Sequence, residues 1–382
     1  MFERTKALLD HFLELKVPGY DIAIYKDGEC LMRRAGGYVD MEEKITHKGD
    51  ELYNMYSSSK TVTCVAAMML YERGLFKLED ELGNYLPEYG DMKVKTPDGV
   101  HPAKTRIKVE DLFQMTAGFN YGIRCKPVLR AIKETDGRAP TREIIRALAE
   151  EPLEFDPGTS WKYSLCHDVL ACLVEVLSGI RFAKFVDDNI FKPVGMQNST
   201  FHIPTEERER ICTQYRYSYE TKVVERVTKG NIYDLGPDYD SGGASMVSTL
   251  DDFVLFGEAL RKGEILKPET VTLLSTDRLG CGPRRDAFTL DDYGYGLGVR
   301  CPRGDGDPRG ANMYDFGWSG AAGAHFGVDV VHGITVSHVQ HVLNFPNYDA
   351  KRTMMRTLTA DILDEEIGDR SAINESKQGI TY

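Results

Sequence analysis

Two residues three positions apart, Ser57 and Lys60, carry the first chemical signal in the chain. The apolar spacing that follows them, up to about Gly74, predicts an α-helix, and residues i and i+3 of a helix share one face. The Ser57 hydroxyl and the Lys60 amine are therefore expected within hydrogen-bonding reach. A hydroxyl becomes a good nucleophile when a neighbouring base removes its proton, and a neutral amine can be that base. The pair indicates a serine hydrolase without a histidine, although a motif this short also arises by chance.

The composition limits the kind of protein that carries this pair. The 382 residues are enough for two lobes, and a net charge of −12 argues against binding nucleic acid or anionic membrane surfaces. Residues 1–12 mix charges with apolar positions, which predicts an amphipathic helix instead of a signal peptide, and no later segment approaches 18 apolar residues. We therefore expect a cytoplasmic protein, and its eight cysteines, without a Cys-x-x-Cys pair, are expected as free thiols.

Strand-like runs lie near both ends of the sequence, and helical periodicity lies between them. Alternation at 20–25 and 29–35 around Asp27-Gly28 predicts a hairpin. Further strands are expected at 215–219, 222–227, 295–300, 312–316, 323–330 and 333–338. Helices are expected at the N-terminus and at 57–74, 109–115, 141–150, 164–178, 182–189, 249–262, 267–276 and 348–365.

This order of elements predicts an α+β fold. One antiparallel sheet is built from both termini and flanked by terminal helices, and a mainly helical lobe is inserted. The expected domains are a discontinuous α/β domain of residues 1–90 and 231–382 and a mainly helical domain of residues 91–230. The active site is expected between them.

Four stretches in order resemble motifs of the serine β-lactamase and penicillin-binding-protein-like superfamily, in particular its class C β-lactamase-like esterase branch (family VIII carboxylesterases). They are Ser57–Lys60, Ile107–Gly118, Phe155–Ser164 and Phe316–Gly323. The resemblance implies the β-lactamase/transpeptidase-like fold, with Ser57 as nucleophile and Lys60 as its base. Tyr163 matches the tyrosine of the second motif, where a phenol beside a lysine can relay the Ser57 proton and activate water. The backbone N–H groups of Ser57 and Ala321 would form the oxyanion hole.

Two departures from the antibiotic-recognising relatives concern the substrate. Those relatives carry Lys-Thr-Gly or His-x-Gly where this chain has Trp318-Ser319-Gly320, and tryptophan offers apolar surface and one N–H donor but no charge. Gly320 would let the substrate approach closely. Leu165 stands where the second motif often has an asparagine that contacts an acylamide. With Trp318, Ser319, Gly320 and Leu165 as substrate-binding residues, a neutral and fairly apolar acyl group is expected.

Other signals carry less weight. His338 and His341, three apart on an expected strand, would face opposite sides and converge poorly on one ion, so we expect no metal and no cofactor. The run Asp240–Ser245 is expected as a loop at the cleft rim, either a flexible connection or a substrate contact. Loops at 118–140, 231–245 and 280–292 would set the pocket shape.

We therefore predict a serine carboxylesterase that acts on a small-molecule ester through an acyl-enzyme on Ser57. Alternatives are an acyltransferase that uses the same acyl-enzyme, a D-amino-acid peptidase or weak β-lactamase, and a non-catalytic family member. The natural ester, the acyl chain length and the oligomeric state have no signature in the sequence.

Overall fold

The central sheet of the protein is formed by both ends of the chain. The computed structural model describes residues 2–228, 230–279, 293–302, 315–345 and 361. The five strands lie in the order β12-β13-β1-β2-β3, and all neighbours are antiparallel. Their bounds are β1 Gly19–Lys26, β2 Glu29–Asp40, β3 Ile45–Thr46, β12 His325–Asp329 and β13 Ile334–Gln340.

The first hairpin of this sheet is the one predicted from the sequence. Asp27 and Gly28 join β1 to β2 with φ values of 51° and 90°, the left-handed pair that a two-residue hairpin turn favours. Tyr20, Ile22 and Ile24 of β1 belong to one apolar cluster, whereas Ala23 belongs to the other. Because strand side chains alternate between faces, β1 is covered on both sides.

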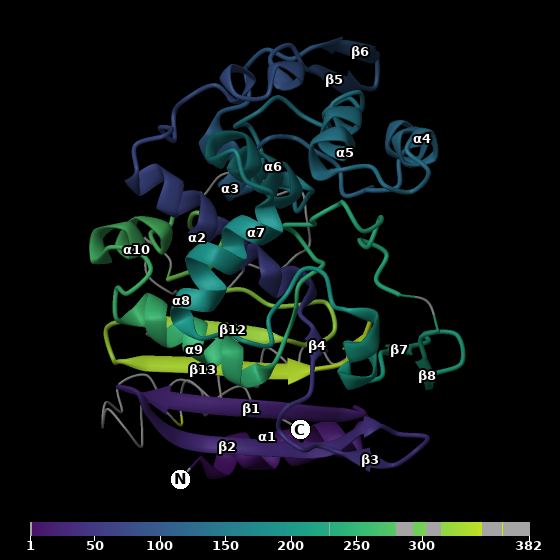
Figure 1. Ribbon diagram of the computed structural model, residues 1–382, viewed down its shortest axis with the longest axis vertical. Coiled ribbons are helices and arrows are strands. Elements are labelled where there is room, and N and C mark those ends of the chain that lie inside the picture. Colours follow the sequence, from purple (N-terminus) through teal and green to yellow (C-terminus); the bar gives the residue numbers. More distant parts are fainter. Residues whose placement is uncertain (1, 229, 280–292, 303–314, 346–360, 362–382) are drawn as a thin grey trace.

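A helix packs on each face of the sheet (Figure 1). α1 (Glu3–Glu14) buries Leu9 and Phe12 in the cluster that contains Tyr20, Ile22 and Ile24. α9 (Leu250–Arg261) covers the opposite face, where Phe253 and Phe256 pack on Phe326 of β12. The sequence predicted the second flanking helix at 348–365, which lies outside the described residues except for Asp361. The helix α9, from the middle of the chain, was not predicted as part of this cover.

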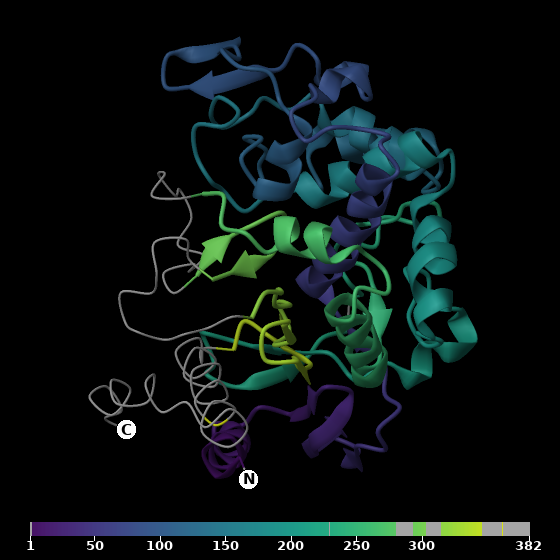
Figure 2. The same cartoon turned by 90° about the vertical axis from the view of Figure 1, so that its left-hand side faces the viewer.

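The remaining helices lie mainly above the sheet in the view of Figure 1. They are α2 Ser59–Glu72, α3 Val109–Gln114, α4 Lys126–Glu134, α5 Thr141–Leu148, α6 Cys166–Ser178, α7 Phe182–Val186, α8 Lys192–Val194 and α10 Pro268–Leu274. α4, which was not predicted, packs against α5. Figure 2 shows α2 between the upper helices and the sheet, and residues along nearly its whole length are buried. Since α2 follows directly on Ser57, the candidate nucleophile is held in the interior of the fold.

Short sheets of two or three strands complete the structure. They are β4 Tyr53–Asn54 with β9 Val247–Ser248, β5 Lys93–Thr96 with β6 Gly99–Pro102, β10 Gly294–Tyr295 with β11 Arg300–Cys301, and β14 Val342–Leu343 with β7 Tyr215–Tyr217 and β8 Val224–Arg226. The single strand predicted at 295–300 is wrong: β10 and β11 form a hairpin there. Gly298 in its turn has φ 83°, and a Cβ on it would meet the Cys64 Sγ at 2.1 Å. This close approach to α2 requires glycine and breaks the strand.

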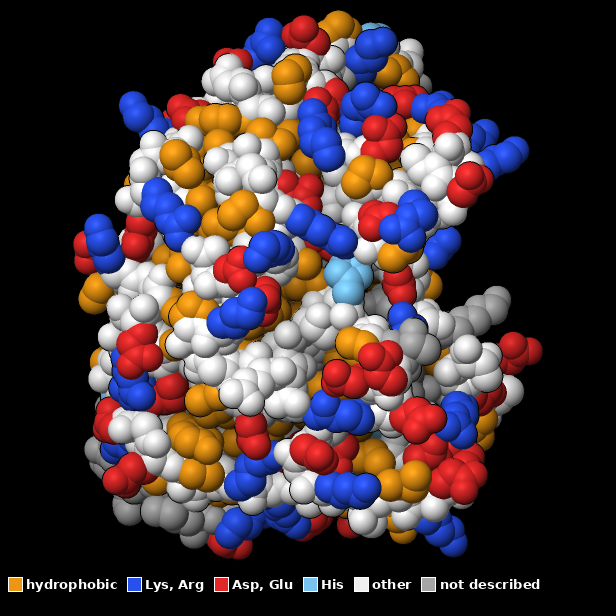
Figure 3. Space-filling view, in the orientation of Figure 1, with side chains coloured by type: hydrophobic (Ala, Val, Ile, Leu, Met, Phe, Trp, Pro, Cys, Tyr) orange, Lys and Arg blue, Asp and Glu red, His pale blue; other side chains and the backbone are white. Residues whose placement is uncertain are grey.

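The described surface and interior fit the composition. On the face in Figure 3, positive and negative side chains are interspersed. All seven cysteines within the described residues are free thiols, and Cys281 lies outside them. Within the same residues, no helix combines the length and the apolar character needed to cross a bilayer.

Candidate active site

The Ser57 hydroxyl and the Lys60 amine meet as the sequence predicts. Ser57 lies in a 3₁₀ turn, Tyr56–Ser58, that leads directly into α2, and its Oγ is 3.2 Å from the Lys60 Nζ. The Ser57 residue is 8% exposed and Lys60 is fully buried. Tyr56, immediately before the serine, has φ 45°, a left-handed conformation that costs a non-glycine residue about 1–3 kcal/mol. Strained backbone next to a reactive side chain is typical of functional sites.

The Lys60 amine is held from a second direction by the backbone. Its Nζ donates to the Gly243 carbonyl oxygen at 2.7 Å, across 183 residues of sequence. Two aromatic rings lie beside the same nitrogen, with centroids at 4.8 Å for Tyr163 and 5.7 Å for Tyr121. A flexible lysine side chain is thereby confined to one position, next to Ser57.

Tyr163 and Trp318 form a stacked pair beside this lysine. Their ring centroids are 5.8 Å apart with planes at 13°, and the Trp318 Nε1–H donates to the Tyr163 hydroxyl oxygen at 3.2 Å. Trp318 carries no charge and brings one N–H donor to the Tyr163 oxygen. The structure therefore joins the second and third predicted motifs at one point.

The glycine of the third motif fits closely against the first. A Cβ on Gly320 would meet the Met55 carbonyl oxygen at 2.4 Å, so only glycine allows this contact with the segment before Ser57. Ser319 is exposed and its Oγ lies 3.1 Å from the His325 Nδ1. His325 Nε2 in turn lies 3.0 Å from an Arg300 nitrogen, which can only donate. Ala321, the predicted second oxyanion donor, follows at an exposed position.

An aromatic cluster around Tyr163 escaped the sequence analysis. Tyr121 packs on Tyr163 at 5.1 Å and on Tyr233 at 5.7 Å, and Tyr295 packs on Trp318 at 5.3 Å. Burial raises the pKa of Tyr233 to about 12, and burial together with the neighbouring Tyr163 raises that of Tyr121 well above its ordinary value. Both phenols therefore stay protonated at neutral pH. Because tyrosine is common in this chain, only their position in space distinguishes them.

Two sequence predictions about the site need correction. Leu165 is fully buried, so it packs in the core behind the second motif and presents no surface to an acyl group. The run Asp240–Ser245 is not a flexible loop at the cleft rim: Asp240 and Ser241 are fully buried, and Gly243 contacts Lys60. The local sequence does not show that Leu165 and the run Asp240–Ser245 are buried, because their burial follows from packing against distant helices.

One group of side chains within the described residues approaches the arrangement of a metal site. Single ligand atoms of Asp21, His47 and Glu51 lie within 4.8 Å of one another. The carboxylates already have partners, since Asp21 accepts from Arg33 and Glu51 accepts from the Gly49 N–H at 2.9 Å. Both carboxylates of the trio are therefore already engaged by protein donors, and we assign no ion to it.

Comparisons with known proteins agree with this geometry. Esterase EstB of Burkholderia gladioli is 29% identical over 362 residues, which cover 87% of this chain and 88% of EstB. Among solved structures, EstCE1, a hydrolase with promiscuous acyltransferase activity, has a TM-score of 0.75 at 22% identity and covers 94% of this chain and 97% of its own. Simvastatin synthase (LovD) of Aspergillus terreus has a TM-score of 0.75 at 19% identity, over 95% and 98% of the two chains.

These structural neighbours confirm the predicted β-lactamase/transpeptidase-like α+β fold. The family model described as Beta-lactamase matches residues 5–360. Since that match spans nearly the whole chain, the protein belongs to the Beta-lactamase family.

Proposed function

We propose that the protein is a serine hydrolase that cleaves carboxylic esters through an acyl-enzyme on Ser57. The observation that carries the proposal is the contact of 3.2 Å between the Ser57 Oγ and the buried Lys60 Nζ, beside the Tyr163–Trp318 pair. A nucleophile, a nitrogen base and a phenol within one small volume are what acyl transfer requires. A scaffold without catalysis would gain nothing from burying Lys60 next to a serine.

The reaction then follows from these positions. Lys60 takes the Ser57 proton while Oγ attacks the ester carbonyl carbon. The negative charge that develops on the carbonyl oxygen is stabilised by the N–H groups of Ser57 and Ala321, each worth a few kcal/mol in such a site. The tetrahedral intermediate collapses to the acyl-enzyme, and the alcohol leaves with the proton of the Tyr163 hydroxyl. Water then gives a proton to the Tyr163 oxygen and attacks the acyl-enzyme; the bond to Ser57 Oγ breaks, Lys60 returns its proton to Oγ, and the acid is released.

The surroundings favour a neutral, apolar acyl group as substrate. Trp318 is uncharged, and Tyr121 and Trp318 are among the aromatic side chains that pack on Tyr163. Aromatic surface stabilises apolar groups by burial and gives no counter-charge to a carboxylate. A substrate with a free carboxylate, as in a β-lactam or a peptide C-terminus, would therefore lack its usual cationic partner at the third motif.

Acyl transfer is the second candidate function. EstCE1 is described as having promiscuous acyltransferase activity and LovD as a synthase, and both share the fold of this chain. The two reactions differ only in whether water or an alcohol attacks the acyl-enzyme. Hydrolysis in the presence of a competing alcohol, with the products separated by chromatography, distinguishes them.

The primary test uses p-nitrophenyl esters of graded chain length. Ser57→Ala should abolish turnover while its circular dichroism spectrum and melting temperature stay close to those of the wild type. Ser58→Ala is the matched control, because Ser58 is the adjacent residue, is fully buried, and has a hydroxyl without a hydrogen-bond partner among the described residues. Ser58→Ala should keep its activity. Unchanged hydrolysis by Ser57→Ala would end the proposal.

A further inference from the structure

The segment Tyr239–Gly243 is buried deep in the protein and ends on the catalytic lysine. Asp240 and Ser241 are fully buried, and Tyr239 is 2% exposed. The segment has no regular secondary structure, so its backbone is not held by a helix or a sheet. Contacts of side chains must therefore fix its position, and the buried carboxylates of Asp240 and Asp168 make most of these contacts.

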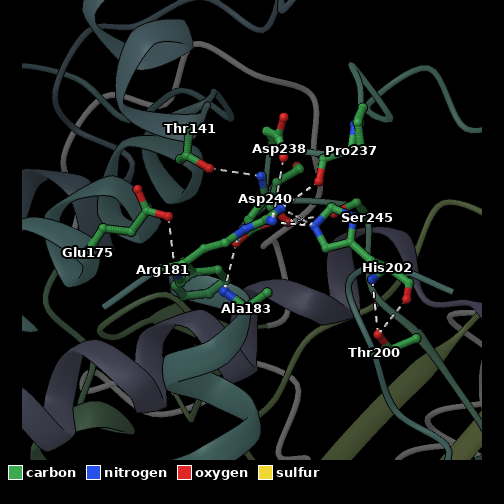
Figure 4. Close-up of polar contacts among 12 residues, drawn as sticks. Thr141, Glu175, Arg181, Ala183, Thr200, His202, Pro237, Asp238, Asp240 and Ser245 are labelled. Atoms are coloured by element: carbon green, nitrogen blue, oxygen red, sulfur yellow. Dashed lines mark hydrogen bonds and ion pairs between the residues drawn. The ribbon is translucent and has the colours of Figure 1, made fainter. Parts of the chain in front are cut away.

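Asp240 is the first of these anchors (Figure 4). Its carboxylate accepts from the Arg181 Nε at 3.0 Å, from the Ala183 N–H at 2.8 Å and from the His202 ring. Its own N–H donates to the Thr141 hydroxyl at 2.8 Å. Burial alone would raise the pKa of Asp240, but the hydrogen bonds from His202 and Arg181 outweigh it and hold that pKa below its ordinary value. Asp240 therefore stays ionised and ties the segment to α5, to α7 and to the loop of His202.

Asp168 is the second anchor. It lies on α6, the helix that follows Tyr163, and is 1% exposed. One of its carboxylate oxygens accepts from the Tyr239 hydroxyl at 2.8 Å and from the Ser241 hydroxyl at 2.6 Å. Asp168 thus holds Tyr239 and Ser241 from α6, on either side of Asp240, which ties the same segment to α5 and α7.

Close packing fixes the position of Gly242 and Gly243, the two glycines that follow Ser241. A Cβ on Gly242 would meet the His167 carbonyl oxygen at 2.5 Å, and a Cβ on Gly243 would meet an Asp168 carboxylate oxygen at 2.5 Å. The Thr63 hydroxyl, one turn after Lys60 on α2, donates to the Gly242 carbonyl oxygen at 2.6 Å. The next carbonyl, that of Gly243, accepts from the Lys60 Nζ at 2.7 Å.

We propose that Asp240 and Asp168 are positioning residues for the reaction: they fix the segment so that the Gly243 carbonyl holds the Lys60 amine against Ser57. A lysine side chain has a flexible four-carbon stem, and its amine needs a fixed acceptor to stay in one place. Loss of that acceptor leaves the substrate-binding surface intact and moves the base, and misplacing a catalytic group by about 1 Å can cost a hundredfold in rate. This role rests on the proposed function of Ser57 and Lys60.

Two variants test the role from opposite sides of the segment. Asp240→Asn keeps the shape but removes the charge that holds Arg181 and His202. Thr63→Val is close in shape and removes the hydroxyl that holds the Gly242 carbonyl, and it gives a second route if Asp240→Asn folds poorly. For each we expect kcat on a p-nitrophenyl ester to fall by about tenfold or more, with KM within about threefold of the wild type.

Matched controls separate positioning from general loss of stability. Glu258→Gln removes the charge of another buried carboxylate that pairs with an arginine, since Glu258 accepts from Arg261 at 2.7 Å and from Thr335 at 2.7 Å. It should lower the melting temperature and leave kcat unchanged. Thr63→Ser restores the hydroxyl and should recover most of the kcat that Thr63→Val loses.

The outcomes are distinct. The positioning role would be overturned if Asp240→Asn and Thr63→Val had the same kcat as Glu258→Gln while the three variants had similar melting temperatures. The proposed function would still stand in that case. An equal fall of kcat in Glu258→Gln would overturn it too, because the effect would then reflect stability alone. A wild-type protein with no hydrolysis that depends on Ser57 would overturn the proposed function itself, and the positioning role with it.

Discussion

The hydrogen bond from Trp318 to Tyr163 makes a quantitative prediction for Trp318→Phe. Phenylalanine keeps an aromatic ring in the stack, whose planes lie at 13°, and removes only the indole N–H that reaches the Tyr163 oxygen. In the proposed reaction the Tyr163 oxygen gains negative charge when it gives up or relays a proton. A donor aimed at that oxygen is therefore worth more in the transition state than in the resting enzyme.

The magnitude follows from the distance. A hydrogen bond to a charged group contributes about 1.5–3 kcal/mol, and 3.2 Å is at the long end of the N–H···O range, so the lower value applies. A loss of about 1.5 kcal/mol of transition-state stabilisation corresponds to a fall in kcat of about tenfold. The smaller ring also leaves a cavity that lowers the melting temperature, but a cavity alone does not slow the chemical step of the folded enzyme.

The assay is steady-state hydrolysis of a p-nitrophenyl ester, with the folded fraction checked by circular dichroism. Trp161→Phe is the matched control: Trp161 is 2% exposed, packs on the same Tyr163 ring at 6.4 Å, and its Nε1–H has no hydrogen-bond partner among the described residues. It should leave kcat within about twofold of the wild type, because the substitution breaks no hydrogen bond. A kcat for Trp318→Phe that matches that of Trp161→Phe would show that this hydrogen bond does not stabilise the transition state.

Two further predictions concern the base and the pH dependence of stability. Lys60→Met keeps an unbranched stem without the amine and should lower kcat by about 10²–10⁴-fold, as removal of a general base does; hydrolysis within tenfold of the wild type would exclude Lys60 as the base. Burial, and after it the like charge of Asp240, raises the pKa of Glu175 from 4.5 to about 7. The folded state therefore binds this proton more tightly than the unfolded state does. The protein loses stability as the pH rises from about 4.5 to about 7. In Glu175→Gln the side-chain oxygen can still accept from the Phe182 N–H. Urea unfolding should find this variant more stable than the wild type at pH 8, by at most about 3 kcal/mol, with no such gain at pH 4.5. An equal difference in stability at both pH values would contradict this prediction.

Local patterns predicted local structure well. Helical periodicity predicted α1 and α2 to within a few residues, and the Asp27-Gly28 pair predicted the turn of the first hairpin, because propensity and turn geometry depend on neighbours in sequence. The prediction at 295–300 was wrong for the opposite reason. The turn at Gly298 is imposed by contact with α2, some 230 positions earlier in the chain. The local sequence pattern does not indicate this contact.

The reactive side chains of the candidate site were predictable from residue types and spacing: a serine and a lysine three apart, a tyrosine in a recognisable motif and a tryptophan in place of a cation. Their types and order are covalent facts, and the helix that brings Ser57 and Lys60 together is a local structure. The group that holds Lys60 from the other side was not predictable in this way, because it depends on how distant segments pack. That partner is the carbonyl of Gly243, a group that every residue carries, so its identity as an acceptor has no signature in the sequence and follows from buried contacts between segments far apart in the chain.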